Sequence, residues 1–124
     1  MVKVNEHLDG AKKFCEIGIE EYEDGRKSGN ILKMREGCEK VFHAYVEAST
    51  ALIQKRELPE PEDHGERVEA LYKLGDRKMI EVGKDAFYFL HRLAYYGYKI
   101  LPDVDKTLKD VEEIIKYVQK RIRC

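Results

Sequence analysis

Apolar residues recur along this chain at steps of three and four, which is the spacing of one face of an α-helix. The pattern predicts helices over about residues 4–27 and Ile31–Arg56, separated by the turn 28–30 (Ser-Gly-Asn). The apolar stripe of the first helix is Val4, Leu8, Ala11, Cys15, Gly18 and Tyr22. The expected buried side of the second is Ile31, Met34, Cys38, Val41, Phe42, Tyr45, Ser49 and Leu52. Because the connection is short and Ala11 and Gly18 are small, we expect a closely packed antiparallel hairpin.

Residues 58–66 (LPEPEDHGE) form the one long loop, in which Pro59 and Pro61 prevent the helix from continuing. A short helix, Glu66–Leu74, follows with Val68, Leu71 and Tyr72 as its apolar positions. Gly75 and Asp76 then predict a helix C-cap followed by an N-cap. The last helix, Asp103–Arg123, has the stripe Val104, Leu108, Val111, Ile115, Val118 and Ile122. These patterns predict one all-α domain over residues 1–124, an up-and-down four-helix bundle with one additional short helix.

The remaining helix, Met79–Leu101, holds six of the twelve aromatic residues and is expected to end at Pro102. At about 100° per residue, its apolar face is Met79, Gly83, Ala86, Phe87, Leu90, Leu93, Ala94, Gly97 and Leu101. The opposite face carries Glu81, Tyr88, Arg92, Tyr95 and Lys99, with Lys84 and His91 on its flank.

The polar and aromatic residues Tyr88, His91, Arg92, Tyr95 and Lys99 are therefore the candidate site. Three interpretations are open for them. The helix packs on several sides within its own chain, or it forms a homodimer interface, or it lines a groove where tyrosines stack on bases and cations bind phosphate. We expect a homodimer, because Phe89, Tyr96, Tyr98 and Ile100 widen the apolar face beyond what a four-helix bundle buries.

The charge balance narrows the function. With 23 basic and 24 acidic residues, the net charge of −1 argues against a general nucleic-acid coat protein. A local basic patch remains possible at the end of the last helix. Its cations either complement the helix dipole or bind phosphate: Lys116, Lys120, Arg121 and Arg123. The sequence contains no apolar run of about 18 residues and therefore predicts no membrane span. The N-terminus is too polar for a secretory signal, so we expect a cytoplasmic protein. Asn, Gln, Ser and Thr occur only twice each, a composition typical of thermophiles.

Catalytic and metal motifs find little support. Glu39, His43 and Glu47 form an i, i+4, i+8 row, but no Glu-x-x-His pair accompanies it, so a solvated row is favoured over a metal site. No nucleophile elbow or phosphate-binding loop is present. Cys15 and Cys38 are expected to be core thiols, with a disulfide as the alternative in a hyperthermophile. We predict no cofactor, no metal and no catalytic residue.

The helix and loop EGCEKVFHAYVEASTALIQKRELPEPEDHGE, followed by a short helix and an aromatic helix ending HRLAYYGYKIL, resembles the HEPN superfamily. Within it, the similarity is to the archaeal PaREP-type proteins. The resemblance implies a four- to five-helix bundle, often dimeric, that handles nucleotides or RNA.

Active HEPN proteins are metal-independent ribonucleases with an Arg, four to six residues, then a His. This chain lacks the motif, because seven residues separate Arg35 from His43 and also Arg56 from His64. We therefore predict a non-catalytic module that binds a nucleotide, a nucleic acid or a partner protein. The alternative is a divergent ribonuclease that uses Arg35 with His43, or His91 with Arg92, across a dimer interface.

Overall fold

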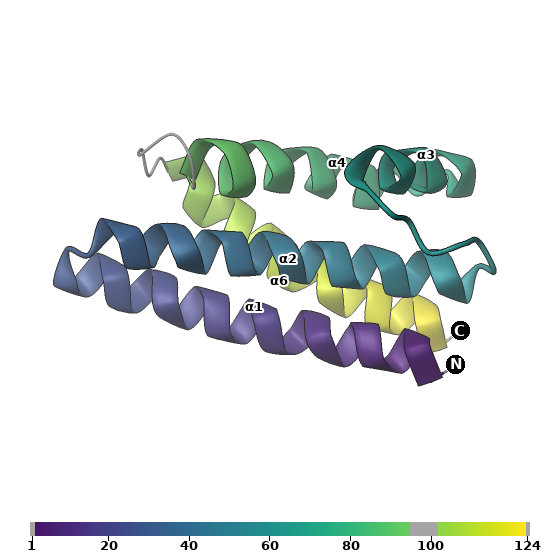
Figure 1. Cartoon of the computed structure of the whole chain (residues 1–124), viewed down its shortest axis with the longest axis horizontal. Helices are drawn as coiled ribbons and strands as arrows, with labels where there is room; N and C mark the ends of the chain where they lie inside the picture. Colours follow the sequence, from purple (N-terminus) through teal and green to yellow (C-terminus); the bar gives the residue numbers. More distant parts are fainter. Residues whose placement is uncertain (1, 95–101, 124) are drawn as a thin grey trace.

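The computed structural model describes residues 2–94 and 102–123. Helices α1 (Val2–Ser28) and α2 (Ile31–Lys55) form the predicted antiparallel hairpin (Figure 1). Gly29 turns the chain at a positive φ of 72°, which favours glycine. Asn30 then caps α2, its side-chain oxygen accepting a hydrogen bond from the Lys33 N–H at 3.0 Å. Every residue of the predicted α1 stripe is buried.

The prediction for the buried side of α2 is wrong at one residue. Ile31 is 53% exposed, because it is the first residue of α2 and lies at the turn where α1 ends. The residues from Met34 to Leu52 that were predicted to face inward are buried.

The two helices of the hairpin touch backbone to backbone at Gly18 and Gly37. A Cβ atom on Gly37 would lie 2.5 Å from the Gly18 carbonyl oxygen, and one on Gly18 would lie 2.7 Å from the Gly37 carbonyl oxygen. Both distances are shorter than any real Cβ contact, so only glycine fits on either side. The close approach expected from the small residues of α1 is confirmed.

Helix α2 is central, because it packs against α1, α3, η1 and α6. Helices α3 (His64–Leu74), α4 (Arg77–Asp85) and the π-helix η1 (Ala86–Leu93) lie together along one side of it. Helix α6 (Pro102–Arg123) runs behind this arrangement and returns the chain to the neighbourhood of its N-terminal end (Figure 1). No strand occurs in residues 2–94 and 102–123, so the all-α class is confirmed.

The caps between α3 and α4 are as predicted. Gly75 ends α3 with a positive φ of 68°, and the Asp76 carboxylate accepts the Met79 N–H at 3.2 Å to begin α4. The starts of α3 and α6 differ from the predictions. Helix α3 begins at His64 because Asp63 caps it, accepting the Glu66 N–H at 2.8 Å. Helix α6 begins at Pro102, since proline fits the first turn of a helix.

The buried face of α3 differs from the predicted one. Arg67 and Leu71 are buried, whereas Tyr72 is 56% exposed and Val68 is half-buried. With this side of α3 facing α2, the Arg67 guanidinium donates a hydrogen bond to the Thr50 hydroxyl of α2 at 3.3 Å. A stripe of only two or three apolar residues does not determine which side of a short helix meets its neighbour.

The predicted aromatic helix starts at Arg77 and changes from α to π geometry at Ala86. Five residues of its predicted apolar face are buried: Met79, Gly83, Ala86, Leu90 and Ala94. Phe87 and Leu93, also predicted for this face, are half-buried. Predictions for Tyr95, Gly97, Lys99 and the rest of 95–101 fall outside the described residues. Across the described helices, none combines the length and the hydropathy that a bilayer crossing requires.

Candidate functional site

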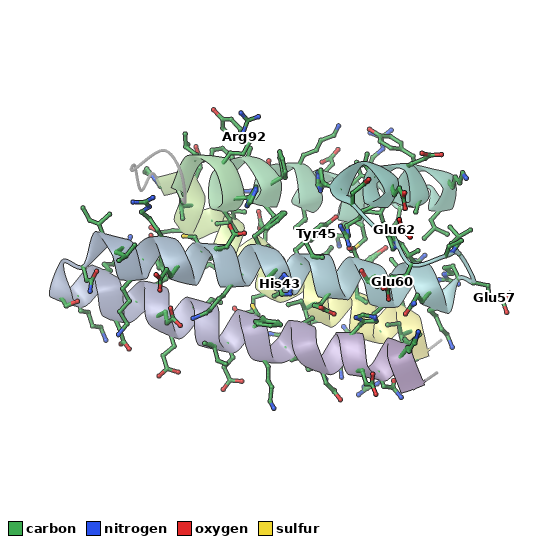
Figure 2. The ribbon with its side chains drawn as sticks, in the orientation of Figure 1. His43, Tyr45, Glu57, Glu60, Glu62 and Arg92 are labelled. Atoms are coloured by element: carbon green, nitrogen blue, oxygen red, sulfur yellow. The ribbon has the colours of Figure 1, made fainter. Side chains whose placement is uncertain are left out.

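The predicted polar and aromatic face of the fourth helix divides into two parts. Tyr88, 52% exposed, and Arg92 lie on the outer side of η1, and Figure 2 shows Arg92 pointing away from α2. His91 instead lies half-buried on the side that faces α2. Tyr95 and Lys99 lie outside the described residues. The structure therefore brings Tyr88 and Arg92 to one surface and does not join His91 to them.

His91 ties η1 to α2. Its Nδ1 lies 2.9 Å and 3.0 Å from the two carboxylate oxygens of Glu39. Its ring stacks on Phe42, with 4.8 Å between ring centroids and 24° between planes. The contact joins residues 52 positions apart, and this long-range role was missed in the sequence.

A second stacked pair continues this row. The ring of His64 in α3 lies 4.3 Å from that of Phe87 in η1, at 14°. Phe42 and Phe87 meet edge to face at 6.0 Å, so the four rings of His91, Phe42, Phe87 and His64 form one aromatic row. Burial lowers the pKa of His64, and nearby Arg67 and His91 lower it further. The His64 imidazole is therefore neutral near pH 7.

The row of Glu39, His43 and Glu47 does not converge on one point. Glu39 contacts His91, whereas Glu47 contacts His7 of α1 and lies 3.7 Å from the Nε2 of His43. Each carboxylate thus pairs with histidines in a different part of the fold. Among the described residues, no three His, Cys, Asp or Glu side chains are arranged to hold a metal ion.

Cations from two helices gather on one surface, which we call the basic surface: Lys78 of α4 and Lys116, Lys120 and Arg121 of α6. They surround a shallow hollow of about 490 Å³ that contains Tyr117 and one acid, Glu113. Three of these cations were predicted as a candidate patch from the tail of α6. Lys78 was missed, because no local pattern in α4 shows that it will lie beside α6.

Tyr117 organises the basic surface. The Lys78 ammonium lies 5.1 Å and the Arg121 guanidinium 5.4 Å from the centre of its ring, distances at which a cation is attracted to an aromatic face. The Tyr117 hydroxyl donates to the buried Asp76 carboxylate at 3.0 Å. Burial raises the pKa of Tyr117, and the hydrogen bond to Asp76 adds to the shift. Tyr117 therefore stays neutral.

The cysteines in the core are unsuited to nucleophilic chemistry. Cys15 and Cys38 are both free and buried, as expected for core thiols, and the alternative of a disulfide between them is wrong. Burial raises the pKa of each thiol to about 12, with smaller contributions from Glu112 at Cys15 and Asp105 at Cys38. At neutral pH the reactive thiolate is therefore scarce at both positions.

A comparison of the chain with models of protein families, with curated proteins and with solved structures finds no match.

Proposed function

We propose that this protein is a non-catalytic helical module that binds RNA through the basic surface. The observation that carries the proposal is the convergence of Lys78 from α4 with Lys116, Lys120 and Arg121 from α6 around one hollow. Phosphate groups are the natural counterions of such a surface, and lysine and arginine side chains supply most of the affinity of non-specific RNA binding. The resemblance to HEPN proteins points to the same class of ligand.

The cations of this surface are available for binding. In residues 2–94 and 102–123, Lys78, Lys116 and Lys120 form no salt bridge, and Arg121 lies 4.0 Å from the Asp76 carboxylate. A phosphate would therefore displace few existing contacts. If all four cations contact a single strand, log K should fall with log of the salt concentration with a slope of about −3, since each phosphate contributes about −0.7.

Fluorescence anisotropy with a short labelled single-stranded RNA tests this proposal. We expect Lys116→Glu with Lys120→Glu to weaken binding at low salt by about tenfold or more and to reduce the salt slope by about one to two. The matched control is Lys13→Glu with Lys27→Glu, which makes the same charge change on exposed positions of α1. Equal weakening by both double variants, or no binding at low salt, would refute the proposal.

The same protein incubated with unlabelled mixed RNA tests the ribonuclease alternative. We expect intact RNA, because the HEPN catalytic spacing is absent and His91 is engaged with Glu39 rather than placed beside Arg92 on the surface. RNA cleavage that is lost in His91→Ala or His43→Ala would replace the binding proposal with the enzymatic one.

We further propose that the module is an up-and-down HEPN-like four-helix bundle of α1, α2, α4–η1 and α6, with α3 as the additional helix.

We propose that it pairs as a homodimer through the outer side of η1, supported by the exposure of Tyr88 beside Arg92. Light scattering should give twice the monomer mass, reduced to the monomer by Tyr88→Glu. A native monomer would contradict this. We also propose that the protein is cytoplasmic and comes from a thermophilic archaeon. The low content of Asn, Gln, Ser and Thr supports the thermophilic source, and the resemblance to the archaeal PaREP-type proteins supports the archaeal one.

A further inference from the structure

A cavity of about 150 Å³ lies where α3 and the α4–η1 helix meet over α2. Most of its wall is apolar and comes from the side chains of Val68, Leu71, Ile80 and Phe87. This volume is about that of an internal cavity able to hold a benzene-sized molecule. The space is therefore large enough for a small organic ligand and too small for a nucleotide.

Arg67 lies in the wall of this cavity and is only 7% exposed. Within the described part of the chain, its guanidinium makes one hydrogen bond, to the neutral Thr50 hydroxyl, and no salt bridge. Its Nε is buried with no acceptor. The Tyr45 hydroxyl, which lines the same cavity, donates to the Met79 carbonyl at 2.7 Å and makes no hydrogen bond with this Nε.

An arginine in this state is unusual. Buried charged side chains are almost always paired, because removing a charge from water costs several kcal/mol unless an opposite charge compensates. Burial accordingly lowers the pKa of Arg67, although Glu47, Asp63 and Glu60 oppose the shift from a distance. No carboxylate of the described residues lies within salt-bridge distance of the guanidinium, so an anion bound in the cavity would compensate its charge.

Two further groups mark the same cavity. The Nδ1 of His64, one turn before Arg67 on α3, is also buried without a hydrogen-bond partner among the described residues. Lys84 contributes to the wall from α4 and is exposed to solvent, where its charge attracts an anion toward the cavity. Two residues with an unpaired buried nitrogen and one exposed cation thus line an otherwise apolar space.

We infer that this cavity binds a small carboxylate with a compact apolar body, such as an aromatic or branched aliphatic acid. The planar guanidinium matches a carboxylate with two parallel hydrogen bonds. The apolar wall suits the rest of such a molecule, but it offers too few donors for a fully charged inorganic phosphate or sulfate. A neutral ligand would leave the charge of Arg67 unpaired.

This site is separate from the basic surface, because none of Lys78, Lys116, Lys120 or Arg121 lines the cavity. The inference therefore does not rest on the RNA-binding proposal, and an experiment that refutes one of the two does not refute the other.

Thermal unfolding of the full chain tests the inference, with benzoate, 3-methylbutanoate, benzamide and inorganic phosphate as probes at matched ionic strength. Benzamide has the shape of benzoate without its charge. We expect the carboxylates to raise the melting midpoint by about 3–5 °C at ten times the dissociation constant. Benzamide and phosphate should leave it unchanged.

Two variants locate the site. Arg67→Met should abolish the carboxylate shift without unfolding the protein, since replacing an unpaired buried charge by an apolar side chain is often neutral or stabilising. Val68→Phe keeps the charge and fills the cavity, so it too should abolish the shift. Arg77→Met removes an equal charge from an exposed position on α4 and should preserve it.

Four results would overturn the inference. An equal shift with benzamide would show that the charge of the ligand is irrelevant, and a shift with phosphate alone would assign the cavity to an inorganic anion. A carboxylate shift that persists in both Arg67→Met and Val68→Phe would place binding elsewhere. The absence of any shift at millimolar probe would make Arg67 a structural residue only.

Discussion

Replacing Gly37 with alanine should destabilise the protein, although alanine is the better helix former. The added Cβ would lie 2.5 Å from the Gly18 carbonyl oxygen, 2.7 Å from the Tyr22 nitrogen and 3.1 Å from the Tyr22 Cα. All three are backbone atoms of α1, so no side-chain rotation relieves the overlap. Ordinary contact distances would require α1 and α2 to separate locally by close to an ångström.

Two opposing terms set the magnitude. Alanine gains about 0.8–1.0 kcal/mol over glycine in a helix interior. Overpacking a well-packed contact costs about 1–3 kcal/mol, and a gap of 0.5–1 Å forfeits about a quarter to a half of each dispersion contact along the interface. Because the obstructing atoms are backbone, we expect the upper part of that range and a net loss of about 1–2 kcal/mol in the free energy of unfolding.

Gly10→Ala is the matched control. It lies in the interior of α1, and its added Cβ would meet only the Glu47 side chain, at 3.9 Å. Without an overlap, the helix preference acts alone and should stabilise the protein by about 0.5–1 kcal/mol. Urea unfolding followed by far-ultraviolet circular dichroism compares the two. A Gly37→Ala variant as stable as the native protein, or a shift of the same sign in both variants, would refute the backbone contact between α1 and α2.

Other predictions concern pH, the core thiols and temperature. Burial disfavours the charged form of Asp105, but hydrogen bonds from Tyr22 and Arg26 outweigh it and lower its pKa below 3.8. A lowered carboxyl pKa stabilises the folded state above the unfolded value and loses this effect as the pH falls through the folded value. The stability difference between the native protein and Asp105→Asn should therefore shrink below about pH 4, and a difference independent of pH would contradict the pairing. A thiol reagent followed by mass spectrometry should label neither Cys15 nor Cys38 until the protein unfolds, because both pKa values are raised to about 12; rapid labelling of either would contradict its burial. The composition predicts a melting midpoint above about 70 °C, and one near 50 °C would show that the low amide content was overinterpreted.

The approximate extent of the helices could be predicted from the sequence because the interactions that begin and end a helix are local. Gly75 and Asp76 mark the boundary between α3 and α4 by backbone conformation and capping, which depend on immediate neighbours. The long stripe of α1 identified a buried face that the structure confirms in full, since six residues over five turns define one direction around the helix. Helical periodicity likewise predicted that the candidate residues Tyr88 and Arg92 lie on the outer face of their helix, where the structure has them.

The groups that carry the two proposed binding sites depended on the tertiary structure. Lys78 lies near Lys116 only because α4 packs beside α6. Outside these two sites, the contact of His91 with Glu39, 52 positions away in the sequence, likewise depends on the tertiary structure. Arg67 was not among the residues predicted to be buried, but the way α3 packs on α2 buries it beside a cavity. The physical reason is one of range. Periodicity, capping and backbone preference act within a turn or two of helix, whereas the side of a short helix that is buried, and the charges that meet there, depend on the shape of the helices it packs against.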